Sequence, residues 1–195
     1  GPGALPGLKT RNVKAVIAPH AGYAYSGPAA AWSYKALGET PKPDVYMIIG
    51  PNHNSFETAL SNDSWQTPLG IARTDSRFVT QLSRNANIPI NEQLHAVEHS
   101  LEVQLPFLQF VLGEEAPALK IAPLILGLDT DLKEVALAIK EVIIDQAKNV
   151  FFIISSDFTH YGRFYHYMPF TLNVKKNIYE LDGKALEFIK NLDAE

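Results

Sequence analysis

Short apolar runs rich in Val and Ile recur along the chain, and they lack the alternating polar positions of a half-exposed strand. Continuous runs of this kind are typical of strands buried on both faces of a parallel sheet. Each run is followed by a loop and then by a segment with helical spacing of its apolar residues. The predicted strands are residues 13–19, 44–50, 120–127 and 149–155.

The segments between these runs predict helices. The first is expected over residues 29–37, with Ser26 or Gly27 as its cap and Pro28 in its first turn. Asp131 stands near the start of a later one. The turn at residues 68–70 indicates a small antiparallel excursion within residues 58–74. The remaining predicted helices are residues 76–86, 131–146 and 172–192.

Strands that alternate with helices predict a three-layer α/β/α fold with a mainly parallel or mixed central sheet. The length of 195 residues fits one domain, expected over residues 1–195. The chain starts at Gly1 without an initiator Met and stops at Glu195 within a helical pattern. We therefore expect residues to be missing at both ends.

The composition limits the kinds of partner that we expect the protein to bind. The formal net charge is −4 and Lys and Arg do not cluster, so we expect no nucleic-acid binding. No apolar run approaches the roughly 20 residues of a membrane span, and we expect a cytoplasmic protein without membrane contact. The sequence has no Cys, which excludes disulfides and thiolate ligands within these residues.

Histidines follow the ends of separate predicted strands. His20 follows the first strand, His53 the second and His160 the fourth. In open α/β sheets, ligands bind beyond the carboxyl ends of the strands, so these side chains are expected to converge. Neutral imidazoles suit divalent transition metals, and open sites with two His and a further donor are typical of non-haem iron oxygenases and catalytic zinc. The sequence thus predicts a metal site formed by the three histidines.

A second group of polar residues, His95, Glu98, His99 and Glu102, lies before the next apolar segment. The pairs 95/99 and 98/102 are each four apart and are predicted to share a helix face. One hypothesis is an amphipathic helix with a polar start. The other is that Glu98, His99 or Glu102 supports the metal ligands or contacts substrate in the same crevice.

Three further residues stand beside the strand-end histidines. Tyr23 and Asn52 are expected to contact substrate or support the ligands. Asp157 either caps the turn after its strand or orients a metal-bound histidine. Ser155 and Ser156 next to it suggest a hydrolytic triad with Asp157 and His160, but the chain has no G-x-S-x-G elbow. Nucleotide-binding glycine motifs are absent as well.

Four motifs in order carry a resemblance to a known family. They are APHAGY at residues 18–23, GPNH at 50–53, EHSLEVQLP at 98–106 and SSDFTHYG at 155–162. Together they resemble the MEMO family, which is similar in fold to the class III extradiol ring-cleavage dioxygenases. The resemblance extends from about Lys14 to the end of the chain.

The resemblance implies a three-layer α/β fold with one metal-lined crevice. It implies that His20 and His53 are metal ligands and that His160 lies in the same pocket as an acid–base residue. Relatives close to the human protein carry a further metal-binding cysteine near the C-terminus, in a segment that this chain does not reach. They often have cysteine where this chain has Thr159, and many have an opening motif that is absent here. These departures predict a truncated form of a microbial member.

Three functions remain open at this stage. The first is a metal-binding protein in which Fe or Cu, or alternatively Zn, holds O2 and a substrate while His160 moves a proton. Its third protein ligand would be Asp157, Glu98 or Glu102. The second is a non-catalytic module that binds a peptide or small molecule and keeps a vestigial metal site. The third is a metal-dependent hydrolase.

Overall fold

The computed structural model describes residues 2–3 and 7–193. The chain forms two compact units, Gly1–Ser156 and Asp157–Glu195. The first unit contains the whole sheet and most of the helices, while the second contains the last long helix. The single-domain organisation expected from the sequence stays a prediction.

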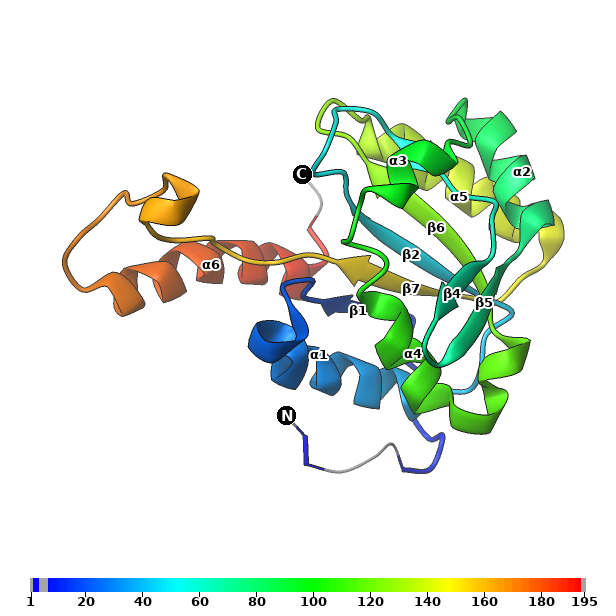
Figure 1. Ribbon diagram of the computed structural model, residues 1–195, viewed down its shortest axis with the longest axis horizontal. Coiled ribbons are helices and arrows are strands. Elements are labelled where there is room, and N and C mark those ends of the chain that lie inside the picture. The colour runs from blue at the N-terminus through cyan, green and yellow to red at the C-terminus, as the bar shows by residue number, and fades with distance from the viewer. Residues whose placement is uncertain (1, 4–6, 194–195) are drawn as a thin grey trace. The chain divides into compact units, whose positions relative to one another are not determined.

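The first unit is built on a mainly parallel sheet (Figure 1). The four predicted strands are present and adjacent, in the order β1-β7-β2-β6, and all of them are parallel. Beyond β6 the sheet continues through β5, which is parallel to β6, to β4, which is antiparallel to β5. The strands are β1 (Ala15–Ala18), β2 (Val45–Pro51), β3 (Ala59–Leu60), β4 (Trp65–Thr67), β5 (Gly70–Thr74), β6 (Lys120–Leu126) and β7 (Val150–Ser155).

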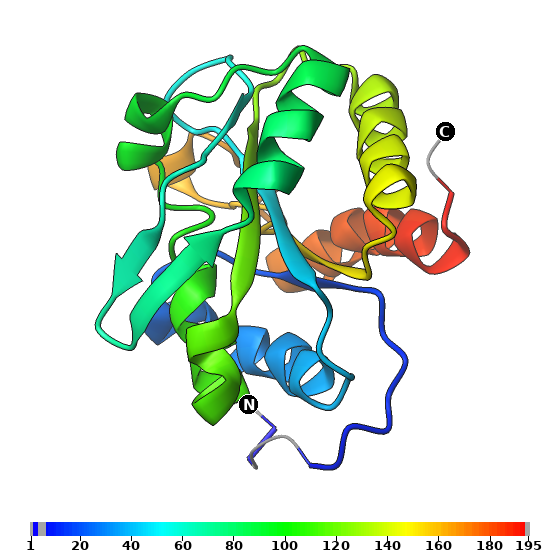
Figure 2. The same cartoon turned by 90° about the vertical axis from the view of Figure 1, so that its right-hand side faces the viewer.

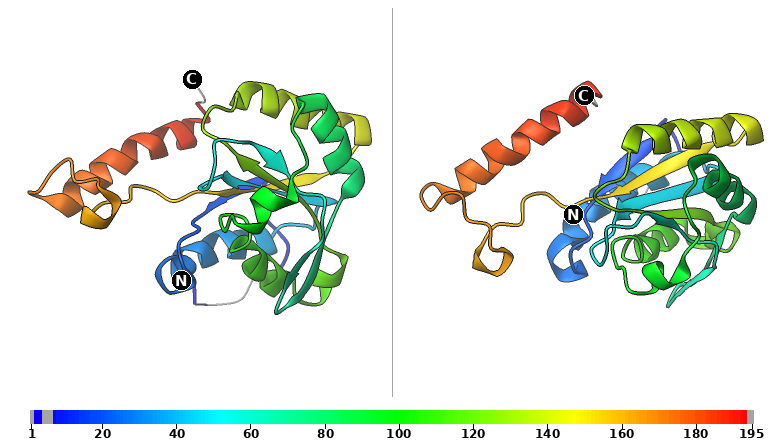
Figure 3. Two further views of the ribbon diagram at one scale, coloured as in Figure 1. Left: turned by 45° about the horizontal axis from the view of Figure 1, so that its top comes forward. Right: turned by 90° about the horizontal axis from the view of Figure 1, so that it is seen from above.

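Helices cover both faces of this sheet (Figure 2). On one face lie α1 (Tyr23–Gly38) and α4 (Gln104–Leu112), and on the other lie α2 (Ser76–Ala86) and α5 (Leu132–Gln146). Successive strand residues point to opposite faces, so Val45 and Met47 pack with α2 and α5. Tyr46 and Ile48 pack with α1 and α4. The two buried clusters form the three-layer α/β/α fold predicted from the sequence, and Figure 3 shows its layers from two further directions.

The antiparallel excursion is confirmed. β4 and β5 form a hairpin in which Trp65 pairs with Ala72, and β3 pairs antiparallel with β6. The start of α5 is also as expected, because the Asp131 side chain accepts hydrogen bonds from the first turn. Shorter elements of this unit are α3 (Glu92–Ala96) and the 3-10 helix η1 (Gly113–Ala118).

The predicted start of the first helix is wrong. α1 begins at Tyr23, six residues before the expected start, and encloses Pro28. The Ser26 hydroxyl donates to the Ala21 carbonyl oxygen (2.6 Å) instead of capping the helix. A proline removes one backbone hydrogen bond, and a helix tolerates this best near its beginning, so Pro28 does not fix the boundary.

The second unit contains the 3-10 helix η2 (Arg163–Tyr165) and α6 (Val174–Asn191). The Thr159 hydroxyl donates to Asp182 of α6 (2.6 Å), which ties the segment after β7 to the helix. Tyr161 donates to the Phe170 carbonyl and its ring stacks on that of Phe170. In the part of the chain that the structure describes, no helix combines the length and the apolar character needed to cross a membrane.

Candidate metal centre

Two of the predicted histidines meet at the carboxyl edge of the sheet. β1 and β2 both pair with β7 in parallel, so the residues that follow these strands leave the sheet at the same edge. His20 follows β1 and His53 follows β2. The centroids of their rings lie 5.1 Å apart, with the planes at 77°. The parallel direction of the strands therefore places both histidines at one edge of the sheet, as the sequence predicts.

A third imidazole, that of His99, joins the pair from the loop between α3 and α4. The His99 ring stacks on His53 with a centroid separation of 4.9 Å and meets the edge of His20 at 5.8 Å. The sequence predicts that His99 supports the metal ligands or contacts substrate. One potential ligand atom from each of His53, Glu98 and His99 lies within 4.8 Å of the others, which suits a metal-binding group.

Glu98 is the buried anion of this cluster, with 3% of its surface exposed. Its Oε1 accepts from His53 Nδ1 (2.9 Å) and from the Ser100 backbone N–H (2.8 Å), and Oε1 lies 3.3 Å from His99 Nδ1. Its Oε2 accepts from the His53 backbone N–H (2.6 Å) and the Asn54 amide (3.3 Å). Burial raises the pKa of Glu98, but the hydrogen bonds from His53 and Ser100 outweigh it and lower the pKa to about 2.

The ionised carboxylate determines how His53 is presented. Because a carboxylate only accepts hydrogen bonds, His53 Nδ1 carries the proton and the lone pair lies on Nε2. The hydrogen bonds to Glu98 occupy the roughly four acceptor positions of its two oxygens. Glu98 is therefore better suited to orient His53 and to supply negative charge than to coordinate an ion directly.

His20 has a neutral partner. Its ring is almost fully buried, with 4% of the residue exposed, and Nδ1 lies 3.0 Å from the Ser155 hydroxyl oxygen. Ser155 ends β7 and is also buried, and its hydroxyl donates to the Ser100 carbonyl oxygen (2.6 Å). A hydroxyl held in this way is not presented as a nucleophile, so the geometry gives no support to a hydrolytic triad with Ser155 as the nucleophile. Sequence reasoning missed the pairing of Ser155 with His20, although strand register could have indicated it.

Gly50 makes room for this arrangement. A Cβ at this position would lie 2.8 Å from the Leu101 side chain and 3.1 Å from both Ser100 Oγ and Ser155 Cβ. The loop that carries Glu98 and His99 thus approaches the end of β2 more closely than a larger residue would allow. Ser100 Oγ also donates to the Pro51 carbonyl oxygen (2.8 Å), which fixes the loop against the strand end.

The other residues predicted around the site have different surroundings. The Asn52 amide is occupied within its own loop, where it donates to Ser55 and Glu57 and accepts from two backbone N–H groups. It therefore shapes the loop that carries His53. Glu102 is exposed. Tyr23 is half-exposed at the start of α1, and burial together with the charge of Glu102 raises its pKa.

His95 lies apart from the histidine cluster. The prediction that residues 95 and 99, or 98 and 102, share a helix face is wrong, because α3 ends at Ala96. His95 is buried, its Nε2 donates to the Ala59 carbonyl oxygen (3.1 Å) and its ring meets the edge of Trp65. Burial lowers its pKa. These contacts attach α3 to β3 and β4.

His160 and Asp157 belong to the second unit. His160 Nε2 lies 3.3 Å from Asp157 Oδ2, and the His160 ring stacks on Tyr165 with centroids 4.8 Å apart. This geometry agrees with Asp157 orienting the histidine. The predicted convergence of His160 with His20 and His53 stays a prediction.

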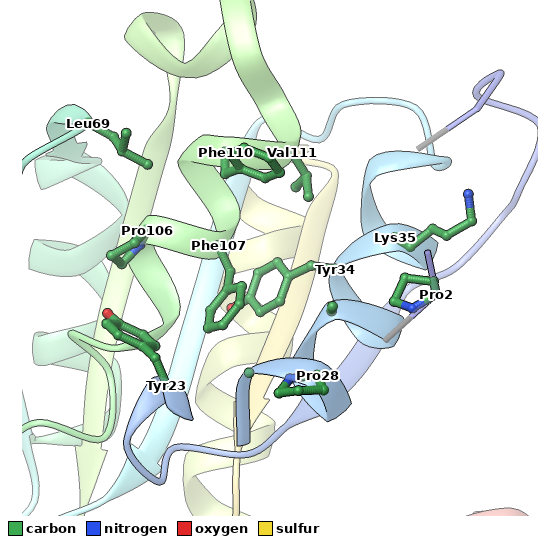
Figure 4. Close-up of a pocket in the computed structure, with 12 residues that line it drawn as sticks. Pro2, Tyr23, Pro28, Tyr34, Lys35, Leu69, Pro106, Phe107, Phe110 and Val111 are labelled. Atoms are coloured by element: carbon green, nitrogen blue, oxygen red, sulfur yellow. The ribbon is translucent and has the colours of Figure 1, made fainter. Parts of the chain in front are cut away.

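An apolar cavity of about 510 Å³ lies between α1 and α4 (Figure 4). Tyr34 and Phe107 stack in its wall with centroids 5.2 Å apart, and Tyr23 meets Phe107 edge-on. The Lys35 ammonium in the lining is paired with Glu39 (2.7 Å). The described residues that line the cavity include no histidine, so it is distinct from the cluster at the sheet edge.

Comparison with known proteins places these motifs in one family. The sequence profile described as Memo-like protein matches residues 2–195. A MEMO1 family protein of Methanopyrus kandleri is 42% identical over 199 residues, which cover 99% of this chain and 66% of that protein. A MEMO1 family protein of Pyrococcus furiosus is 36% identical over 95% of this chain and 67% of its own length. The chain thus spans about two thirds of the length of these curated relatives.

Proposed function

Since this chain belongs to the Memo-like protein family, we propose that its histidine cluster binds a divalent transition metal ion for oxidative chemistry. The observation that carries the proposal is the meeting of three imidazoles beside one buried, ionised carboxylate. Imidazole nitrogens favour Fe or Cu, and also Zn, over Mg or Ca, which prefer shells of oxygen ligands. Fe and Cu are the proposed ions because they also support redox chemistry.

The residues present fit such an ion: ligand atoms of His53, Glu98 and His99 lie within 4.8 Å of one another. The His20 ring meets both of these imidazoles edge-on at its border with this group. His20, His53 and His99 would hold it, and Glu98 would offset part of its charge without leaving its hydrogen bonds. Ligation by His99 in place of a carboxylate departs from the two-His-one-carboxylate pattern considered from the sequence. Three protein ligands leave coordination positions for a substrate, as in catalytic sites.

The chain's own residues would then orient the ligands and transfer a proton. A bound ion supplies Lewis acidity and a redox centre. Glu98 keeps His53 oriented and its Nδ1 protonated. His160, paired with Asp157, is the proposed carrier of a proton, an assignment supported by the SSDFTHYG motif.

A second candidate is a module that binds a small molecule or peptide without catalysis. It is favoured by the cavity between α1 and α4, whose volume falls within the range of ligand-binding sites. The aromatic rings of Tyr23, Tyr34 and Phe107 suit an apolar, flat ligand. In this case the histidines would be remnants of a metal site.

Metal titration separates the two candidates. The chain is titrated anaerobically with Fe(II), and separately with Cu(II) and Zn(II), by calorimetry. We expect His20→Ala and His53→Ala each to weaken binding by at least about 100-fold, because each removes a proposed ligand and its hydrogen bond to Ser155 or Glu98. His166→Asn is the matched control, because His166 is an exposed histidine of the second unit. Its backbone is left-handed, a conformation that asparagine tolerates.

Equal affinity in the parent chain, His20→Ala and His53→Ala would overturn the metal proposal and leave the binding module as the better function. Loss of affinity in His166→Asn as well would mean that the ions bind exposed histidines without regard to the cluster. Circular dichroism and urea unfolding of each variant show that the folded chain is being compared.

A further inference from the structure

A chain of buried polar groups lies beneath His20 and ends at the wall of the apolar cavity. Ser155 is its centre: the hydroxyl oxygen contacts the Ser100 carbonyl (2.6 Å), the Gln104 amide nitrogen (2.9 Å) and His20 Nδ1 (3.0 Å). Gln104 also contacts the Pro19 carbonyl (3.0 Å). At the far end, the Tyr34 hydroxyl donates to Gln104 Oε1 (2.8 Å). Because these groups are buried, the loss of any of these hydrogen bonds would leave an unsatisfied polar group and lower the stability.

The direction of every hydrogen bond in this chain follows from its fixed acceptors. The Pro19 carbonyl only accepts, so the NH2 end of Gln104 faces it and Ser155, while the oxygen end faces Tyr34. The Ser100 carbonyl also only accepts, so it takes the single hydroxyl proton of Ser155. Ser155 already accepts from Gln104, and its remaining role towards His20 is again that of an acceptor.

His20 must therefore donate to Ser155 through Nδ1. In the neutral ring, a proton on Nδ1 places the lone pair on Nε2, and Nε2 is then the nitrogen that can bind an ion. His53 also carries a proton on Nδ1, but there the ionised Glu98 accepts the hydrogen bond. At His20 the hydrogen bond from Nδ1 is accepted by a neutral hydroxyl, that of Ser155. Ser155 and its neighbour Gln104 are buried, with exposed fractions of 2% and 0%.

We propose that Ser155 and Gln104 are positioning residues that hold His20 as its Nδ1–H tautomer and thereby set the metal affinity of the site. The part that concerns affinity rests on the proposed metal-binding function, and the part that concerns the tautomer does not. Partners behind a metal-bound histidine fix its orientation, and their loss typically weakens metal binding by about 10- to 100-fold.

The chain offers a matched control for Ser155. Ser61 is also fully buried, and its hydroxyl likewise donates to one group, Glu92 (2.6 Å), and accepts from another, the Trp65 ring nitrogen (2.9 Å). Ser61 makes none of the described contacts to the three clustered histidines. Ser61→Ala therefore removes a buried hydroxyl with two hydrogen bonds, where Ser155 makes three, without touching His20.

The test compares the parent chain, Ser155→Ala and Ser61→Ala. Long-range ¹H–¹⁵N NMR spectra of the metal-free proteins report which ring nitrogen of His20 carries the proton. Calorimetry with Zn(II), a redox-inert probe, gives the affinity. We expect an Nδ1–H His20 in the parent chain and in Ser61→Ala. In Ser155→Ala we expect a mixture of tautomers and an affinity for Zn(II) reduced about 10- to 100-fold.

An Nε2–H His20 in the parent chain overturns the proposal without any variant, so the test holds even if Ser155→Ala does not fold. An unchanged tautomer in a folded Ser155→Ala also overturns it, as does an equal loss of affinity in Ser61→Ala. If the parent chain binds no metal while its His20 tautomer still depends on Ser155, the metal function fails and the positioning of His20 stands.

Discussion

The ends of β1 and β2 present their histidines in the same protonation state but by different chemistry. Behind His20 lies a buried and wholly neutral chain of Ser155, Gln104 and Tyr34. Behind His53 lies an ionised carboxylate, Glu98, held by backbone and side-chain N–H groups. One anion beside the cluster provides charge for an ion, whereas a second buried anion would add a large desolvation cost. The difference shows that a histidine can be oriented by neutral groups alone, as at His20, or by a carboxylate that also compensates charge, as at His53.

The largest expected effect on stability comes from a substitution that displaces the loop carrying His53. A Cβ at Gly127 would lie 1.8 Å from the Phe56 carbonyl oxygen, which no side-chain movement relieves. Gly127→Ala should lower the free energy of unfolding by about 3 kcal/mol, measured in urea. It should disturb His53 in NMR spectra and leave the tautomer of His20 unchanged.

Gly27→Ala is the control, because its added Cβ meets only the Phe107 ring edge at 3.7 Å, within α1. It should be neutral or stabilise by up to about 1 kcal/mol. A change of the His20 tautomer in Gly127→Ala would contradict the assignment of that tautomer to Ser155 and Gln104.

A smaller loss of stability is expected from neutralising Glu98, the ionised partner of His53. Glu98→Gln keeps the shape of the side chain but places an NH2 group among N–H donors, so it should cost about 2 kcal/mol of stability. Binding of Zn(II) should weaken at least about 10-fold, measured by calorimetry, because His53 loses its ionised acceptor. Glu102→Gln removes an exposed charge four residues away and should change neither quantity measurably. If the two variants behaved alike, the carboxylate of Glu98 would have no special role.

The smallest effect is expected at the far end of the neutral chain. Tyr34→Phe removes one hydroxyl and leaves Gln104 Oε1 without its donor, which should cost about 1 kcal/mol in urea unfolding. The tautomer of His20 should persist, since the Ser155 contact is retained. Tyr25→Phe, at a tyrosine that is 87% exposed, should be silent. A change of the His20 tautomer in Tyr34→Phe would mean that the side-chain amide of Gln104 flips, exchanging its oxygen and NH2 positions, once the Tyr34 hydroxyl is removed.

Much of the fold could be predicted because its signals are local. Continuous apolar runs indicated the buried parallel strands, and the side chain of Asp131 capped the predicted α5. The meeting of His20 and His53 followed from strand direction alone. The start of α1 was not predictable from Pro28, because a proline near the beginning of a helix marks a boundary only on average.

The rest of the site depends on contacts between distant segments. His95 and His99 have the spacing of helix neighbours, yet the backbone turns between them, and only one of them reaches the cluster. Ser155 and Gln104 carry no motif for contact with His20, since the residues are 135 and 84 positions away from it. The hydrogen bonds among these groups depend on strand register and on the space left by Gly50.

The strand order also determines when the site can form during synthesis. β1 pairs with β7, so Ala15 reaches its partner Phe152 only after nearly the whole first unit has been made. At typical translation rates this delay is on the order of 10 s. Until then β1 has no parallel partner, and His20 lacks the acceptor that fixes its proton. The ribosome-bound chain therefore carries a histidine-rich but unassembled edge, and its last parallel pairing completes the surroundings of His20.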